Sequence, residues 1–144
     1  MQHLKQVVEQ HLATTDVRFT QGRKSTVEAL AAMHGPRTAA EIHDQVGDTV
    51  PLSSLYRSLS VLTDAGVLSA QHGSDGVIRF ELAEWITGHH HHLVCTSCGS
   101  VVDVTPTADQ ETTMEQLVED MAQEADFDVS GHRFEIEGTC RTCR

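Results

Sequence analysis

Two closely spaced cysteine pairs constrain the fold of this chain more than any other feature. Cys95 and Cys98 form one Cys-x-x-Cys, Cys140 and Cys143 form a second, and the 144-residue sequence has no other cysteine. Each pair can supply two thiolates to a metal ion from adjacent turns of the backbone. The two pairs together complete the tetrahedral coordination of one structural zinc ion. Because about forty residues separate the pairs, the chain between them must fold so that they meet. We predict a structural zinc site.

A run of four histidines, His89 to His92, leads directly into the first cysteine pair. In an extended chain alternate side chains point to opposite faces. His89 and His91 therefore face one way, and His90 and His92 face the other. One short segment can supply ligands to two further metal sites, although a solvated loop or an unselective metal trap would also explain the run.

The sequence shows no sign of a membrane span or an export signal. No apolar run approaches eighteen residues, and the N-terminus lacks the apolar stretch of a signal peptide. We therefore expect a soluble, cytoplasmic protein with no membrane partner. In that reducing compartment paired cysteines indicate metal ligands rather than disulfides, and the context of a thioredoxin-like redox pair is missing.

The net charge of −11 disfavours nucleic acid as a partner, but the charge is unevenly distributed. From Met1 to Trp85 acidic residues exceed basic ones by only three, whereas the remainder has three arginines against eleven acids. The nearly neutral first part can still present a basic face to DNA.

The first half of the chain has the pattern of a winged helix-turn-helix domain. Apolar residues at helical spacing predict helices over 2–13 and about 21–33. Thr38 and Glu41 form a capping box that begins a third helix ending at Val46. Two short strands, over 67–71 and 77–82, are predicted to form a hairpin around a glycine-rich loop over 72–76.

A fourth helix between these elements is the expected DNA reader. Ser53 or Ser54 caps it, Gly66 ends it, and its inward face carries Leu55, Leu59 and Leu62. Its opposite face carries donors suited to phosphates and base edges, namely Ser54, Tyr56, Arg57, Ser58 and Ser60. We predict that DNA is contacted by Ser54, Tyr56 and Arg57, with Arg23 from the second helix. Packing alone would also explain a tyrosine on a helix.

The second half predicts a smaller α/β unit. Strands over 93–94 and 101–104 flank the first cysteine pair, and a helix begins at Thr107 or Asp109. Its apolar face carries Met114, Leu117, Val118, Met121 and Ala125. A last strand over 129–137 puts His132, Phe134 and Ile136 on one side. So small a unit buries little by itself, so we expect it to pair with a second copy.

These patterns together predict an α+β protein with an N-terminal winged helix-turn-helix domain and a C-terminal α/β dimerisation domain. The DNA-binding domain spans 1–83, a hinge spans 84–88, and the metal-binding dimerisation domain spans 89–144.

Two ligand sets are predicted around the histidine run. The set within the dimerisation domain is His89, His91, Glu115 and His132, where Glu115 is preferred to Glu111. The regulatory set at the hinge is Glu81, His90, His92 and Asp103, where Glu84 or His34 could replace Glu81. Nitrogen and oxygen ligands of this kind suit Zn(II), Fe(II) and Mn(II) alike.

The order of these features resembles the ferric uptake regulator superfamily over nearly the whole chain. The matching segments are Arg18-Phe19-Thr20, Ser54 to Leu59, Phe80-Glu81-Leu82, His89 to Cys98, and Gly138-Thr139-Cys140. The resemblance implies a homodimeric, metal-dependent repressor in which metal at the hinge closes the dimer onto double-stranded operator DNA. The histidine run with Gly-Thr-Cys-x-x-Cys is most similar to the zinc uptake regulators.

The chain departs from that family at three points. Gln21-Gly22-Arg23 stands where the family usually has Pro-Gln-Arg. Many relatives have a histidine near the start of the third helix, and the nearest one here, His34, lies about two positions early. Some zinc-sensing relatives use a further cysteine at the hinge, and this chain has none to spare.

We therefore expect a zinc-responsive repressor of metal-uptake genes, with Zn(II) in the structural and regulatory sites. An iron, manganese or peroxide sensor of the same superfamily is the alternative. A zinc hydrolase is disfavoured, because the sequence has no His-Glu-x-x-His and no nucleophile in a recognisable setting. We expect no enzymatic activity. A zinc-storage or delivery protein would show no sequence-specific DNA binding.

Overall fold

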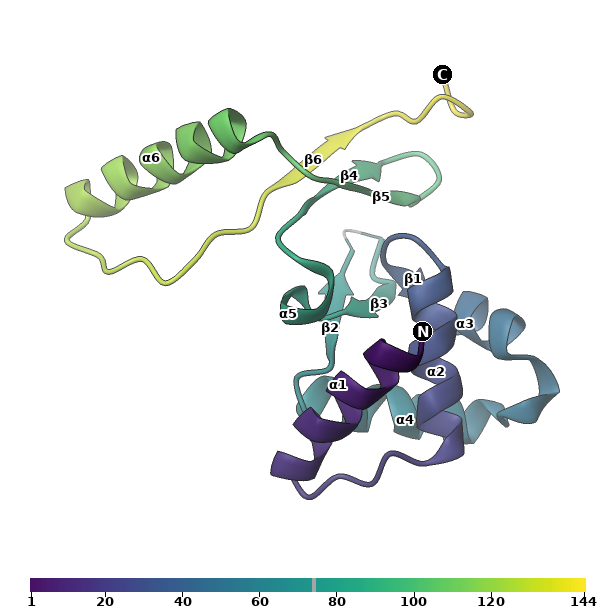
Figure 1. Cartoon of the computed structure of the whole chain (residues 1–144). Coiled ribbons are helices and arrows are strands. Elements are labelled where there is room, and N and C mark those ends of the chain that lie inside the picture. Colours follow the sequence, from purple (N-terminus) through teal and green to yellow (C-terminus); the bar gives the residue numbers. More distant parts are fainter. Residues whose placement is uncertain (74) are drawn as a thin grey trace. The chain divides into compact units, whose positions relative to one another are not determined.

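The chain divides into two compact units, Met1–Gly88 and His89–Arg144. The computed structural model describes residues 1–73 and 75–144 (Figure 1). Ser74, which belongs to the predicted hairpin loop, lies outside the described residues. Among those described, no helix combines the length and apolar character needed to cross a membrane.

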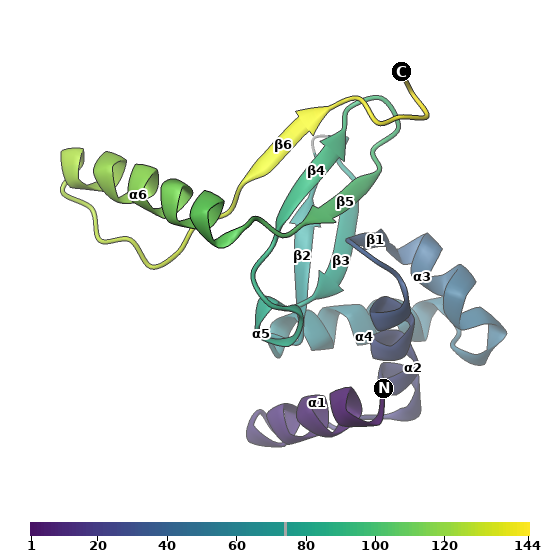
Figure 2. The ribbon, with the colours of Figure 1, turned by 45° about the horizontal axis from the view of Figure 1, so that its top comes forward.

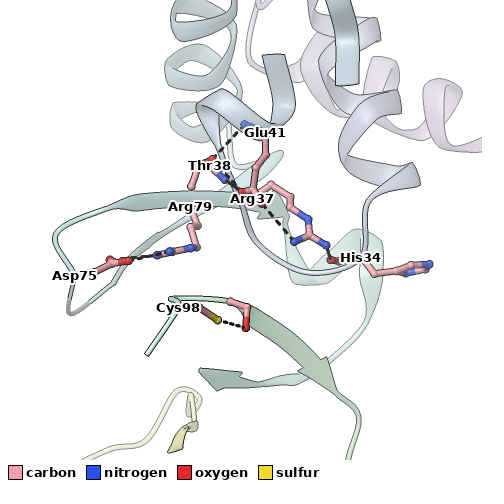
Figure 3. Close-up of polar contacts among 8 residues, drawn as sticks. His34, Arg37, Thr38, Glu41, Asp75, Arg79 and Cys98 are labelled. Atoms are coloured by element: carbon pink, nitrogen blue, oxygen red, sulfur yellow. Dashed lines mark hydrogen bonds and ion pairs between the residues drawn. The ribbon is translucent and has the colours of Figure 1, made fainter. Parts of the chain in front are cut away.

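Helices make up most of the first unit. They are α1 (Gln2–Thr14), α2 (Gln21–Ala32), α3 (Ala39–Val46) and α4 (Leu52–Asp64), with a 3-10 turn, η1 (Gly47–Thr49), before α4. The predicted capping box is confirmed: the Thr38 hydroxyl accepts from the Glu41 N–H, and the Glu41 carboxylate accepts from the Thr38 N–H at 2.8 Å (Figure 3). The predicted serine cap on α4 is wrong. Pro51 precedes the helix, so Ser53 and Ser54 lie inside its first turn.

A small antiparallel sheet completes the winged-helix unit. β2 (Leu68–His72) and β3 (Ile78–Leu82) form the predicted hairpin, each beginning one residue later than expected. A further strand, β1 (Arg37–Thr38), pairs with the other side of β3 (Figure 2). Two residues are too few to show alternation, so the sequence did not reveal β1.

The inward face of α4 forms the centre of the core. Leu55, Leu59 and Leu62 are at most 1% exposed, which confirms their predicted direction. They belong to an apolar cluster with residues from α1, α2, α3 and the start of the wing, including Val8, Leu12, Val27, Leu30, Ile42 and Val67. Ser58, predicted to face outward, is only 6% exposed. It lies three residues after Leu55 and four before Leu62, so it shares their buried side.

The segment predicted as a hinge forms a short helix, α5 (Glu84–Thr87), which ends at Gly88. Gly88 has a φ of +84°, a conformation that favours glycine. Within the first unit, the Trp85 indole N–H donates to the Gly66 carbonyl at 2.8 Å, and its ring stacks on His11. These contacts tie α5 to α1 and to the turn after α4.

The second unit contains three strands and one long helix. β5 (Val101–Val104) pairs antiparallel with β4 (His91–Cys95), and β6 (Glu135–Gly138) pairs parallel with the other edge of β4. The helix, α6 (Ala108–Glu124), begins after Thr107, whose side chain forms a capping box with Gln110. Of the two predicted starts, Thr107 is therefore correct.

The last strand is shorter than predicted. β6 begins at Glu135, which pairs with His92, the second residue of β4. The Phe134 carbonyl still accepts from the His92 N–H at 3.3 Å, but residues 129–134 are not part of the strand, so His132 and Phe134 lie in the approach to it.

Apolar side chains of the second unit remain largely exposed. Leu93 is opposite Val102 on one side and Ile136 on the other, so these three share one face of the sheet. They are 40%, 55% and 58% exposed. Along α6, Met114 and Val118 are half-buried, whereas Leu117 and Met121 are each 54% exposed.

Candidate metal centres and DNA-binding surface

The four cysteines meet at one end of the small sheet. The parallel pairing of β4 with β6 sets Cys95 opposite Gly138, and each cysteine pair spans a turn just after its strand. All four sulfurs lie within 4.8 Å of one another, and the Sγ atoms of Cys98 and Cys140 are 3.8 Å apart. Tetrahedral zinc with Zn–S bonds of about 2.3 Å requires sulfurs about 3.8 Å apart. The group fits such an ion.

Hydrogen bonds already favour thiolates at part of this cluster. The backbone N–H groups of Cys140 and Cys98 lower the pKa of the Cys95 thiol to about 6. The N–H of Cys143 lowers the pKa of Cys140. Hydrogen bonding to Cys140 and Cys98 raises the pKa of Cys143 to about 12. Without a cation the four sulfurs share protons, and a bound metal ion would displace these protons.

Three histidines converge on one carboxylate in the same unit. Nε2 of His89, His91 and His132 lies 3.1, 3.2 and 2.9 Å from oxygens of Glu111. The acid is therefore Glu111, and the preference for Glu115 is corrected. Glu115 lies one helical turn further along α6, about 6 Å away along the axis, and is exposed. The Thr107–Gln110 capping box was the signal that could have identified Glu111, because it fixes the first turn of α6.

This histidine–glutamate group also fits a metal ion. His132 Nε2 and Glu111 Oε1 are buried, and although they lie 2.9 Å apart, neither forms a hydrogen bond of acceptable geometry among the described residues. Tetrahedral zinc with nitrogen and oxygen ligands would separate them by about 3.4 Å, so a small outward shift would accommodate the ion. Burial acts to raise the pKa of the Glu111 carboxyl, but the His91 hydrogen bond and the charges of His89 and His132 together lower it. The carboxylate is thus kept anionic.

His90 and His92 gather on the opposite side of the strand, as the alternation predicts. His92 is opposite Asp103 in the β4–β5 ladder, with Nε2 and Oδ1 3.7 Å apart, and the two imidazole rings lie 5.1 Å apart. Ligand atoms of His90, His92 and Asp103 all lie within 4.8 Å of one another. The second unit thus supplies three potential ligands.

The candidates for a fourth ligand belong to the first unit. Glu81 lies on β3, where its carboxylate accepts from the Gln71 amide at 2.8 Å. Glu84 begins α5, and His34 precedes β1.

The predicted DNA contacts lie at the N-terminal ends of two helices. Ser54, Tyr56 and Arg57 are exposed on the first two turns of α4, and Tyr56 is 56% exposed. Arg23 lies in the first turn of α2, where its guanidinium donates to the Arg18 carbonyl. Ser54, Arg57 and Arg23 line a single pocket.

A winged-helix unit joined to a unit with three clusters of potential metal ligands is the arrangement expected of a metal-dependent DNA-binding regulator. A sequence model of the Ferric uptake regulator family matches residues 14–137, and the chain belongs to that family. Members of the family are metal-responsive transcription regulators, and this chain is one of them.

Individual relatives agree with this assignment. The peroxide-responsive repressor PerR of Staphylococcus epidermidis is 32% identical over 137 residues, which cover 92% of this chain and 85% of the relative. The Vibrio cholerae ferric uptake regulator superposes with a TM-score of 0.75 at 26% identity, covering 92% of this chain and 98% of that one. A zinc uptake regulator complexed with zinc and DNA shares the fold, with a TM-score of 0.62, 20% identity, and coverage of 99% and 93%.

Proposed function

We propose that this protein is a zinc-responsive repressor of metal-uptake genes, acting in the cytoplasm as a homodimer on double-stranded operator DNA. One observation carries the proposal. Three separate groups of metal ligands share a small unit that is joined to a DNA-reading winged helix. The exposed apolar face of Leu93, Val102 and Ile136 supports pairing with a second copy.

The three groups would have different tasks. Cys95, Cys98, Cys140 and Cys143 would hold a structural zinc that stays bound throughout. His89, His91, Glu111 and His132 would hold a second ion inside the dimerisation domain. His90, His92 and Asp103, with Glu81 as the proposed fourth ligand, would form the exchangeable regulatory site. Metal supplies positive charge that allows these ligands to be held together in one geometry.

Regulation would follow from linkage. If Glu81 from the DNA-binding unit joins His90, His92 and Asp103 only in the closed dimer, metal binds that state more tightly. The shift toward the closed state cannot exceed this difference in affinity, and operator DNA must tighten metal binding by the same factor.

A second candidate is an iron, manganese or peroxide sensor of the same family. It is favoured by the donor set of the regulatory group, in which His90, His92 and Asp103 offer only nitrogen and oxygen. The similarity to a peroxide-responsive repressor points the same way.

DNA binding at controlled free metal separates these candidates. Operator duplexes would first be selected from a random library, and binding would then be measured with Zn(II), Fe(II) and Mn(II) side by side. We expect Zn(II) to induce binding at the lowest free concentration. A response to Fe(II) but not Zn(II) would refute the zinc assignment. If none of the three metals induces sequence-specific DNA binding, a metal-storage or metal-delivery protein would be the remaining explanation.

A matched pair of variants assigns the regulatory site. Asp103→Asn should weaken metal-dependent DNA binding, whereas Asp109→Asn, in the exposed first turn of α6, should not. Metal content by mass spectrometry before and after mild chelation should show that one class of ion is lost and another retained.

A further inference from the structure

A polar pocket of about 400 Å³ lies between the first turns of α2 and α4 in the winged-helix unit. Its lining includes Gly22, Arg23, Ser54, Arg57 and Ser58. We propose that this α2–α4 pocket binds one backbone phosphate of the DNA and thereby sets the position of α4 on the duplex. The inference rests on the proposed DNA-binding function and adds a specific phosphate subsite to it.

The two arginines of the pocket are available for an anion. The first unit contains seven lysines and arginines, all within the described residues. Those that pair with carboxylates are Lys5, Lys24, Arg37 and Arg79. Arg23 and Arg57 have no carboxylate within ion-pair distance in the described part of the chain. Of the three that remain, Arg18, Arg23 and Arg57, the last two line this pocket.

Backbone N–H groups add to the attraction. Thr20 and Pro51 precede α2 and α4, and neither helix has a side-chain cap. The first N–H groups of such a helix have no partner within it, and the helix dipole places partial positive charge there. Helices of 12 and 13 residues thus both begin at the pocket.

A largely buried serine side chain supplies independent evidence for a polar ligand. Ser58 is only 6% exposed and lines the pocket, yet its hydroxyl has no hydrogen-bond partner among the described residues. Its Oγ lies 4.0 Å from the point where a side chain on Gly22 would begin. The hydroxyl oxygen is not one of the fully buried atoms that lack a partner, so it can be reached from the pocket. A largely buried polar side chain normally has a hydrogen-bond partner. A phosphate oxygen in the pocket would provide one.

Gly22 keeps this space open. A Cβ placed there would meet Val50 Cγ1 at 3.9 Å and Ser58 Oγ at 4.0 Å, which are ordinary contacts. Alanine would therefore fit, whereas a longer side chain such as glutamine would have to share the space beside Val50 and Ser58, which line the pocket. The absence of a side chain at Gly22 thus leaves room for a phosphate between Ser58 and Arg23.

Free phosphate and DNA present the same chemical group, but the setting favours DNA. Ser54 and Arg57 line the pocket from the exposed side of α4, on which Tyr56 is also exposed. A phosphate held here would lie beside the side chains predicted to read DNA. Contacts of this kind fix the register of a reading helix without carrying sequence information.

A neutral-linkage scan tests the proposal on the full-length, metal-loaded protein. Methylphosphonate would replace one phosphate at a time in an operator selected from random duplexes, and binding would be compared for wild type, Gly22→Gln, Gly22→Ala and Arg23→Gln. Lys5→Gln serves as a charge control outside the pocket. Unchanged thermal unfolding would show that each variant is folded.

In each half of the operator, which one protomer binds, a methylphosphonate at one position should weaken wild-type binding about tenfold. Gly22→Gln and Arg23→Gln should weaken binding to unmodified DNA by a similar factor. For these two variants, the methylphosphonate at that position should cause no further loss of affinity. Their slope of log affinity against log salt should fall by about one per half-site. Gly22→Ala and Lys5→Gln should retain the sensitivity to the linkage.

If each methylphosphonate instead weakens the DNA binding of wild type and of Gly22→Gln by the same factor, the effects of the variant and of the linkage simply add. That result would overturn the phosphate subsite and leave the proposed function standing. Saturable shifts of Ser58 resonances with inorganic phosphate, combined with additive losses, would identify a free-anion site instead. Absence of DNA binding by the wild type with every metal would instead refute the proposed function, and the subsite with it.

Discussion

The two units of this protein depend on different interactions. In Met1–Gly88 a continuous apolar cluster is almost completely buried, with Leu12, Ile42, Leu55 and Leu62 at 0% exposure. In His89–Arg144 the only described residues buried to a similar degree are His91 and Cys95, and both belong to clusters of metal ligands.

This difference indicates what each unit needs in order to fold. The first gains its stability from apolar burial, at about 1.5–3 kcal/mol for each large side chain. The second exposes most of its apolar side chains and cannot be stabilised in the same way. Metal ions and a second copy of the chain are the expected replacements.

The largest expected effect follows from disrupting the cysteine cluster. Structural zinc contributes about 10–16 kcal/mol in small zinc domains, which exceeds what so small an apolar core supplies. Cys140→Ser, or strong chelation, should unfold the second unit and leave the first folded. Amide NMR spectra should lose the dispersed signals of 89–144 only. Simultaneous loss of both sets of signals would show that the units are not independent.

A substitution in the apolar core should destabilise only the first unit. Leu59 is 1% exposed, so Leu59→Ala removes buried apolar contacts and leaves a cavity, at about 2–5 kcal/mol. Chemical unfolding of the winged-helix unit should shift accordingly, while the zinc content measured by mass spectrometry stays the same. Ser60→Ala, on the exposed side of α4, is the matched control.

The apolar sheet face should determine association. Ile136→Asp puts a charge on the face of Leu93 and Val102, and desolvating it should weaken the dimer about a hundredfold. Sedimentation of metal-loaded protein measures this, with Glu137→Gln on the neighbouring position as control. An unchanged dimer would show that another surface forms the interface.

Glu111 and Glu115 provide a test of the histidine-rich site. Loss of the Glu111 carboxylate should weaken the metal bound with His89, His91 and His132 about tenfold. Competition with a coloured chelator should therefore show a weaker site in Glu111→Gln and no change in Glu115→Gln. The opposite result would restore the original choice of Glu115.

The smallest effect is expected at the wing. Figure 3 shows Asp75 beside Arg79, which donates to its carboxylate at 2.8 Å. This hydrogen bond and one from the Val77 N–H hold the pKa of Asp75 at about 2, below its usual 3.8. Because the folded-state pKa is the lower one, this contact stabilises the wing above pH 3.8 and is lost as the pH falls toward 2. Asp75→Asn should abolish that pH dependence in an NMR titration of wing amides. Asp64→Asn is the control, and its pH profile should match that of the wild type.

Local patterns predicted much of this protein correctly. The Thr38–Glu41 capping box, the inward leucines of α4 and the alternation of His89 to His92 each depend on residues a few positions apart. Such short-range patterns depend on backbone geometry that is the same in any fold.

Other features were missed because they depend on partners far away in the sequence. Residues 129–134 have a suitable strand pattern, but the registered pairing with β4 begins only at Glu135, after a single hydrogen bond to the Phe134 carbonyl. Ser58 was predicted from its chemistry to face outward, whereas the packing of α4 turned it inward.

The sequence by itself predicted which groups are candidate metal ligands and which unit has a winged-helix pattern, because ligand chemistry and helical or strand periodicity are properties of short segments. Only the tertiary structure decided that Glu111 rather than Glu115 meets the histidines, and that Gly22 opens a pocket beside Ser58. Both outcomes depend on how one element packs against another, to within a single helical turn, and no local pattern carries that information.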